Sequence, residues 1–379
     1  MKKKMPEADT AAPAPALLGV AIDVSGSMQT SLQNSQMMDL SRLGGVEKGF
    51  SALLDDSRRL AQKYGSDADL PLRVFAYAFG LTAAPRYADL LTVLRFAEGL
   101  ENIPEFKTYM DESIALRRSE AERKGRQMRM NAGGQFGGLA GLARGYGFGN
   151  IVDSIERNME ESARRQLTEE AERNVTQDMI DYMQTRIGDT TLDAGELFRM
   201  WSAGSGSFDS ASRFIFGNTP MRGCLEEVER RFRRERSREG DRAQARILLI
   251  VSDGESTDGL PDEVVKRMKD DGITVACAYV TDRNIQSPRE LRHTVAAEWP
   301  AGARQMFGLA SSADPAGEAV YGPGSDAIRA ELEKSGWTVP PGARLFVQAN
   351  HSDTLADFMR IAGTAIPARQ LLNRVGRII

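Results

Sequence analysis

One stretch of the chain reads Leu17-Leu-Gly-Val-Ala-Ile-Asp23-Val-Ser-Gly-Ser27, a short apolar run that leads into an acidic turn. Such a run, ending abruptly at a carboxylate, is typical of a strand buried on both faces of a parallel sheet. After it, Asp23, Ser25 and Ser27 alternate along one loop, and Gly26 permits the turn. The stretch therefore predicts a buried strand whose carboxyl end presents one carboxylate and two hydroxyls to a ligand.

Similar apolar runs recur along the chain, at residues 72–79, 246–251, 273–280 and 345–348. Helical patterns separate them, at residues 46–63, 222–236, 262–271 and 354–364. Strands that alternate with helices predict an α/β fold with a doubly wound, mostly parallel sheet. Ligands of such sheets bind at the carboxyl ends of the strands, where Asp23 and Asp253 both fall.

The side chains of this loop favour a hard cation. One or two carboxylates together with neutral hydroxyls suit Mg²⁺, which prefers octahedral oxygen coordination and keeps some of its waters, better than they suit Zn²⁺. Mn²⁺ and Ca²⁺ are alternatives. A competing interpretation is that Ser25 and Ser27 only cap the turn after Asp23.

Two later segments complete a pattern around this loop. Thr219 lies in Gly217-Asn-Thr-Pro220 before a predicted helix, and Asp253 lies in Ile250-Val-Ser-Asp-Gly254 after a predicted strand. With these parts in this order, the chain resembles the von Willebrand factor A (VWA) family, in its intracellular bacterial type. In that family an Asp-x-Ser-x-Ser loop, a threonine and a later aspartate form the metal-ion-dependent adhesion site. The resemblance covers residues 17–80, 217–280 and 344–365.

The resemblance implies roles for five residues. Ser25, Ser27 and Thr219 would contact Mg²⁺ directly or through water, while Asp23 and Asp253 would orient waters and balance charge. One coordination position would stay open for an Asp or Glu carboxylate of a partner protein. Bacterial VWA proteins often act beside AAA+ ATPases, kinases or defence-system components. The resemblance therefore implies a non-catalytic, Mg²⁺-dependent adaptor or assembly component.

Long insertions interrupt the resemblance. We expect a disordered tail over residues 1–16, the VWA domain over 17–80, 217–281 and 344–379, a helical and glycine-rich insertion over 81–216, and a second insertion over 282–343. Within the first, helices are predicted at 87–100 and 111–129, followed by a glycine-rich segment at 131–149 that is either a docking loop or a linker. Because the insertion runs into Thr219, we expect it to flank the metal site.

Between Ile151 and Ile187, apolar or small residues recur at every fourth position. Each such step drifts about 40° around a helix, so one straight helix could not bury the stripe against one neighbour. Two helices that break near Asn174 are predicted, packing on the domain or on a second copy of the chain. A self-assembling scaffold with a purely structural metal is therefore an alternative function.

Two further segments carry local signals. Ser287-Pro-Arg-Glu290 is a capping box that predicts a helix through Trp299, and residues 308–325 are predicted to be a loop. Eight arginines fall between positions 230 and 246. They favour a solvated helix end over a phosphate-binding strip, because acidic residues are interspersed among them.

Composition excludes several classes of protein. The net charge of −4 over 379 residues gives no indication of nucleic acid or an anionic membrane as a partner. The only cysteines, Cys224 and Cys277, make neither a disulfide framework nor a zinc site, and Cys224 is expected to pack as a small apolar residue. No stretch approaches the roughly 20 apolar residues of a membrane span. A cytoplasmic protein is predicted.

Catalytic alternatives find little support in the sequence. Only His293 and His351 are present, which removes most acid–base chemistry, so the chain is not expected to be an enzyme. A dinucleotide-binding turn would need several glycines where Gly26 stands alone. A haloacid dehalogenase-type phosphatase would need a second aspartate at the position of Ser25. A metal-dependent phosphohydrolase is the remaining catalytic alternative.

Overall fold

The computed structural model describes residues 15–32, 40–63, 72–82, 86–91, 191–201, 215–239, 244–314 and 324–375, with isolated positions between 104 and 177. The chain forms two compact units, Met1–Arg95 with Asp189–Ile379, and Phe96–Gly188. In the second unit the described positions are helical, and several of them fall in the helix predicted over 111–129. The glycine-rich segment 131–149 and, apart from the helical Gln177, the stripe 151–187 lie outside the described residues.

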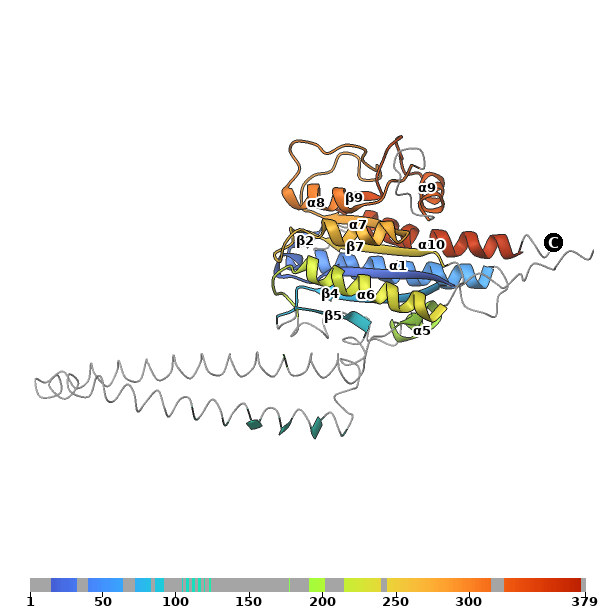
Figure 1. Ribbon diagram of the computed structural model, residues 1–379. Helices are drawn as coiled ribbons and strands as arrows, with labels where there is room; N and C mark the ends of the chain where they lie inside the picture. Colours follow the sequence, from blue (N-terminus) through green and yellow to red (C-terminus); the bar gives the residue numbers. More distant parts are fainter. Residues whose placement is uncertain are drawn as a thin grey trace, which may run out of the picture. The chain divides into compact units, whose positions relative to one another are not determined.

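A seven-stranded sheet forms the centre of the first unit (Figure 1), in the order β5-β4-β1-β7-β8-β9, with β6 also paired to β4. The strands are β1 (Ala16–Asp23), β4 (Leu72–Phe79), β5 (Tyr87–Asp89), β6 (Leu192–Asp193), β7 (Arg246–Ser252), β8 (Ile273–Val280) and β9 (Phe346–Ala349). All pairs from β4 to β9 along this order are parallel, whereas β5 and β6 run antiparallel to β4. The predicted mostly parallel α/β sheet is confirmed.

Helices cover both faces of this sheet. They are α1 (Arg42–Lys63), α5 (Ala194–Met200), α6 (Met221–Glu239), α7 (Asp262–Asp270), α8 (Ala301–Leu309), α9 (Ser325–Lys334) and α10 (Ser352–Val375). In Figure 1, α6 and α7 lie over one face, and α1 runs beside α10 over the other. Every residue of β1, β7 and β8 is buried, because each strand is covered on both sides. Among the described residues, no helix is both long and apolar enough to cross a membrane.

The contact between α1 and α10 is close. A Cβ atom added to Gly49 of α1 would lie 2.4 Å from the sulfur of Met359 in α10, closer than van der Waals packing allows. Glycine therefore lets the two helices approach closely at this crossing, and a larger residue would require the Met359 side chain to move.

The structure corrects the helix predicted over residues 87–100. Tyr87–Asp89 forms strand β5, whose residues pair with Tyr77, Ala78 and Phe79 of β4. Helical geometry begins only at Leu90, and residues 92–100 lie outside the described part. The edge of the sheet supplies hydrogen-bond partners that a local helical pattern does not anticipate. The described ends of the predicted insertion 81–216, namely β5, β6 and α5, thus belong to the sheet unit.

The helix predicted from Ser287 through Trp299 is also wrong, and the next helix, α8, begins at Ala301. The backbone instead pairs with distant residues. Leu291 N–H donates to Thr338 O at 3.0 Å, Thr338 N–H donates to Arg289 O at 2.9 Å, and Leu291 is fully buried. These tertiary contacts outweigh the local capping signal of Ser287.

Three predicted boundaries shift. Strand β1 begins at Ala16, the last residue of the predicted tail. The loop predicted over 308–325 is shorter, because Gly308 and Leu309 end α8 and Ser325 begins α9.

Candidate metal centre

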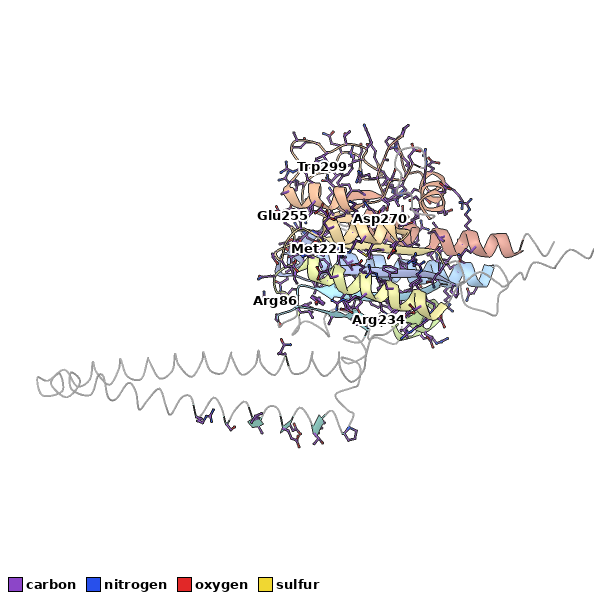
Figure 2. All side chains as sticks on the ribbon, in the orientation of Figure 1. Arg86, Met221, Arg234, Glu255, Asp270 and Trp299 are labelled. Carbon is purple, nitrogen blue, oxygen red and sulfur yellow. The ribbon has the colours of Figure 1, made fainter. Side chains whose placement is uncertain are left out.

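The carboxyl ends of the central strands bring the predicted ligands to one edge of the sheet. Asp23 is the last residue of β1 and Asp253 follows the last residue of β7, and these two strands are adjacent and parallel. Figure 2 labels two residues close in sequence to the predicted ligands: Met221, which follows Thr219 by two positions, and Glu255, which follows Asp253 by two. Both lie toward one end of the unit, whereas Asp270 and Arg234 lie toward the other. The parallel register therefore assembles the loops that the sequence pattern predicted.

Asp23 is fully buried and held by hydroxyl and amide donors. Its Oδ1 accepts the Ser25 N–H at 2.9 Å, and its Oδ2 accepts the Ser252 hydroxyl at 2.6 Å. Burial raises the pKa of Asp23 to about 6, and the charge of Asp253 adds to this shift, while the hydrogen bonds from Ser25 and Ser252 oppose it. A buried carboxylate with a raised pKa gains from a nearby cation, so this position fits a charge-balancing role.

The two serines and Asp253 fit a small octahedral cation. The hydroxyl oxygens of Ser25 and Ser27 lie 3.1 Å apart, and the Ser27 hydroxyl donates to Asp253 Oδ1 at 2.7 Å. Neighbouring ligand oxygens of an octahedron with metal–oxygen distances of about 2.1 Å are about 3.0 Å apart, which these spacings bracket. Ser25 is buried whereas Ser27 is exposed, so the oxygens meet at the surface. The residues present thus fit Mg²⁺ or a similar ion.

Thr219 is held beside Asp253 by the backbone. Its carbonyl oxygen accepts the N–H groups of Thr257 at 2.8 Å and Met221 at 2.9 Å. Its hydroxyl lies close to Gly254, since a Cβ atom on that glycine would be 3.9 Å from it. All five predicted ligand residues are therefore gathered on the loops after β1 and β7 and before α6.

Asp258 fixes the loop that carries Thr219. Its carboxylate accepts the first free N–H groups of α6, from Arg222 at 3.0 Å and from Gly223 at 2.8 Å, and the Ser256 hydroxyl at 2.7 Å. A carboxylate at a helix N-terminus satisfies orphan donors and complements the helix dipole. The loop after β7 thus caps the helix that follows the threonine.

Replacing Asp258 by alanine should lower the free energy of unfolding by about 1 kcal/mol, the usual effect of losing an N-terminal cap. Urea unfolding followed by circular dichroism would measure this change. Asp258→Asn keeps an acceptor and should lose less. Equal losses from the two variants would contradict the capping role.

Glycines and an unusual backbone conformation close the loops over Asp23. Gly80, directly after β4, has φ +104°, and a Cβ atom there would lie 2.5 Å from Ser25 N. Gly217 N–H donates to Gly80 O at 2.7 Å, and Phe216, at φ +77°, donates its N–H to Val24 O at 2.8 Å. Gly80 follows the predicted apolar run 72–79, and a glycine directly after a buried strand is a signal in the sequence for such a close approach.

Arg42 is a further residue of this site that the sequence analysis did not identify. Its Nη1 lies 2.5 Å from Asp253 Oδ2, and its Nη2 lies 3.6 Å from Asp282 Oδ1. Its own N–H donates to Thr30 O at 2.9 Å, which ties the start of α1 to the loop after η1 (Gly26–Gln29). The helix predicted from the sequence begins only at residue 46, so the sequence contains no signal for Arg42, which is the first residue of α1 in the structure.

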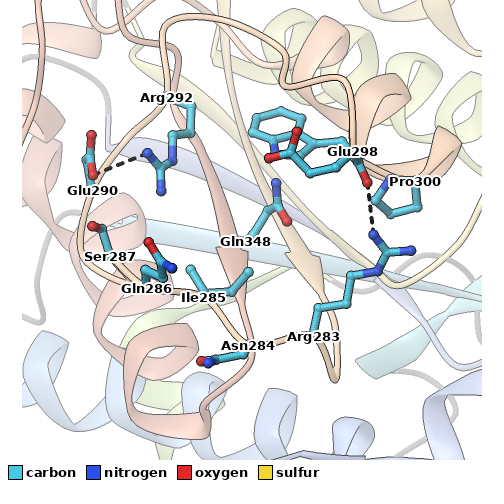
Figure 3. A pocket seen from close by; sticks show the side chains of 11 residues that line it. Arg283, Asn284, Ile285, Gln286, Ser287, Glu290, Arg292, Glu298, Pro300 and Gln348 are labelled. Carbon is cyan, nitrogen blue, oxygen red and sulfur yellow. Dashed lines mark hydrogen bonds and ion pairs between the residues drawn. The ribbon is translucent and has the colours of Figure 1, made fainter.

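A separate cavity of about 310 Å³ lies after the ends of β8 and β9 (Figure 3). Arg283 and Arg292 line it together with Glu290 and Glu298, and Arg292 pairs with Glu290 at 3.2 Å. Arg283 donates to the carbonyl oxygen of Glu298 at 2.9 Å. Two guanidinium groups and two carboxylates therefore balance one another in the lining of this cavity.

Arg236 and Arg238, in the last turn of α6, are exposed, so the predicted solvated helix end is confirmed. The side chains of Arg230, Arg233 and Arg238 are exposed, but Arg231 and Arg246 are buried. Glutamates on α6 pair with most of these guanidinium groups.

Cys224 is buried in the apolar core against the sheet, as predicted.

Comparisons with known proteins yield no match to a family model and none to a curated protein. Among solved structures, the chain is similar to the pilus adhesin SpaC from Lactobacillus rhamnosus GG, with 10% identity and a TM-score of 0.38, over 96% of this chain and 30% of SpaC. The conserved hypothetical protein BatB from Bacteroides thetaiotaomicron matches with 11% identity and a TM-score of 0.35, over 96% of this chain and 99% of BatB.

An aerotolerance-related membrane protein from Bacteroides fragilis matches with 12% identity and a TM-score of 0.33, over 90% of this chain and 94% of that protein. The fold class follows from the sheet itself. Numbered in chain order, the six strands of its main path lie in the order 3-2-1-4-5-6, with parallel central strands and an antiparallel edge strand. The chain has a doubly wound α/β fold.

Proposed function

We propose that this protein binds a divalent cation, Mg²⁺ in the first instance, and uses it to hold a carboxylate of a partner protein. The observation that carries the proposal is the convergence of the Ser25, Ser27 and Asp253 oxygens above the buried Asp23. Hydroxyl and carboxylate oxygens are hard donors, and the spacing of these oxygens suits octahedral coordination. Among the described residues, no group of three or more His, Cys, Asp or Glu side chains is placed to hold a metal ion, so the proposed site depends on the serine hydroxyls as well as on carboxylates.

A binding role agrees with the chemistry of the surrounding side chains. Ser27 is exposed, so a ligand from outside can reach an ion held there. The side chains that contact these oxygens are hydroxyls, carboxylates and the guanidinium of Arg42. Asp23 is the one carboxyl here whose pKa is raised toward neutral, and it is fully buried, so it does not face a ligand that arrives from outside. We therefore assign the site to non-catalytic, metal-dependent adhesion, as an adaptor or assembly component.

Cys224 and Cys277 are free and buried, which suits the reducing cytoplasm in which we expect the protein to act.

Substituting Asp23 with asparagine should weaken Mg²⁺ binding about 10- to 100-fold, the usual effect of removing a group that supports metal ligands. The amide keeps the size of the side chain but removes the charge that balances the ion. Isothermal titration with Mg²⁺ and the rise in melting temperature with added Mg²⁺ would measure the loss.

Asp270→Ala is the matched control, since it removes one exposed carboxylate at the opposite end of the unit. It should bind Mg²⁺ like the wild type. A partner captured by the wild type in Mg²⁺ should be released by EDTA and should not be retained by Asp23→Asn. Equal Mg²⁺ affinity in the Asp23 variant and the wild type would refute the metal site, and partner binding that persists in EDTA would refute the adhesion mechanism.

A further inference from the structure

We propose that Arg42 is a fixed internal counter-charge of the metal site, which couples cation binding to the binding of an anionic ligand. The inference rests on the proposed metal site and concerns its regulation. Its basis is the contact between the Arg42 guanidinium and the carboxylate of Asp253. The same carboxylate also accepts a hydrogen bond from the Ser27 hydroxyl.

The position of Arg42 is unfavourable on local grounds. It is the first residue of α1, where the helix dipole disfavours a positive charge. Its side chain is only 10% exposed, and its Nε is buried without a hydrogen-bond partner among the described residues. A guanidinium that gives up hydration without a full set of acceptors costs free energy. The ion pair with Asp253 is the interaction that offsets this cost, which indicates that the charge of Arg42 acts on Asp253.

The charges at the site sum to a small negative value without metal. Asp23 and Asp253 contribute two negative charges and Arg42 contributes one positive charge, so the buried part carries one negative charge. A divalent cation would turn this into one positive charge in a poorly hydrated place. Without Arg42, the same cation would leave the site neutral. Arg42 therefore makes binding of the cation alone less favourable.

An anionic ligand removes this excess. A carboxylate that takes a position on the cation neutralises the remaining positive charge, so each ligand should bind more tightly when the other is present. The affinity of an uncharged ligand would not be increased by the remaining positive charge. Arg42 would thus make the site selective for an acidic side chain and would weaken its affinity for metal until such a partner arrives.

A purely structural role predicts a different outcome. Arg42 also lies 3.6 Å from the exposed Asp282, so it bridges the loops after β7 and β8. If bridging were its only role, its loss would loosen both loops and weaken metal binding. The two explanations therefore predict opposite changes in metal affinity.

The test measures Mn²⁺ binding to the full chain by electron paramagnetic resonance of free Mn²⁺, in chloride and in acetate at equal ionic strength. Arg42→Gln should bind Mn²⁺ alone at least about tenfold more tightly than the wild type, which corresponds to about 1.4 kcal/mol. Acetate should tighten Mn²⁺ binding to the wild type and have a smaller effect on the variant. Added Mg²⁺ should also raise the melting temperature of the variant by more than that of the wild type.

Each outcome decides the matter. Equal or weaker Mn²⁺ binding by Arg42→Gln would overturn the counter-charge role and leave the metal site intact. Failure of both proteins to bind Mn²⁺ would refute the proposed function, and this inference with it. If Arg42→Gln does not fold, the paired variant Arg42→Gln with Asp253→Asn replaces it, because it removes both partners of the buried ion pair together. Its loaded site has the charge of the wild type, so it should keep the acetate effect; loss of that effect in a double variant that still binds Mn²⁺ would overturn the proposal.

Discussion

Replacing Glu235 by alanine should lower the free energy of unfolding by about 3–5 kcal/mol, because it breaks a buried ion-pair network. Glu235 of α6 is fully buried, and one of its carboxylate oxygens lies 3.0 Å from the guanidinium of Arg73 in β4. The other lies 2.7 Å from Arg238 and 3.4 Å from Arg231. Arg231 is itself buried, so alanine at position 235 would leave a buried cation without its carboxylate.

The network also holds the point where the chain returns to the sheet. Thr191, directly before β6, donates its hydroxyl to Glu235 at 3.1 Å and accepts a hydrogen bond from Arg231. Loss of Glu235 should therefore loosen β6 as well as α6. Hydrogen exchange of the β6 amides would detect this local effect.

Glu226→Ala is the matched control for Glu235→Ala, on the same helix. Glu226 pairs with Arg222 at 3.2 Å, and both side chains are largely solvated, so its loss should change the free energy of unfolding by less than about 0.5 kcal/mol. Urea unfolding followed by circular dichroism would compare the two. If both variants unfold at the same urea concentration, the buried network contributes nothing to stability.

The central strands could be predicted from the sequence because burial on both faces leaves an unbroken apolar run. The run before Asp23 differs from its observed strand by one residue at each end, and the run before Ser252 by one residue at one end. The strand at Tyr87–Asp89 could not be found in this way. It is short and lies at the edge of the sheet, where pairing with β4 rather than hydrophobic pattern determines the conformation.

The same limit applies to the helix predicted from Ser287. A capping box is a local signal worth little more than about 1 kcal/mol. The burial of Leu291 and its backbone pairing with Thr338 depend on residues almost fifty positions away, and no local pattern contains them. Loops between strands are therefore where sequence-based expectations fail in this chain.

The candidate site divides in a similar way. Its oxygen-bearing residues lie directly after strands β1 and β7 or before helix α6, so strand ends and motif spacing locate them. Arg42 and Gly80 contribute through contacts with other segments of the chain, Asp253 and Ser25 respectively. The five predicted ligand residues therefore come from the sequence, but the charge balance and the shape of the loop come from the fold.

Substituting Gly80 with alanine should disrupt the metal site more severely than it disrupts the rest of the sheet. At φ +104° any side chain is strained, at a cost of about 1–3 kcal/mol. In addition, the new Cβ atom would meet the backbone of Ser25, at 2.5 Å from its nitrogen and 2.8 Å from its Cα. Backbone cannot rotate away as a flexible side chain can, so the loop that carries Ser25 and Ser27 must shift.

A shift of that loop separates the hydroxyls from Asp253. We therefore expect Gly80→Ala to lose at least about tenfold in Mg²⁺ affinity, as measured by isothermal titration. Gly336→Ala separates this effect from backbone strain alone, because Gly336 has φ +82° but nothing within 4 Å of the added Cβ atom. That control should lose about 1–2 kcal/mol of stability and bind Mg²⁺ normally. Normal Mg²⁺ affinity in Gly80→Ala would mean that the loop over Asp23 tolerates displacement, and that the observed spacing of its hydroxyls does not determine metal binding.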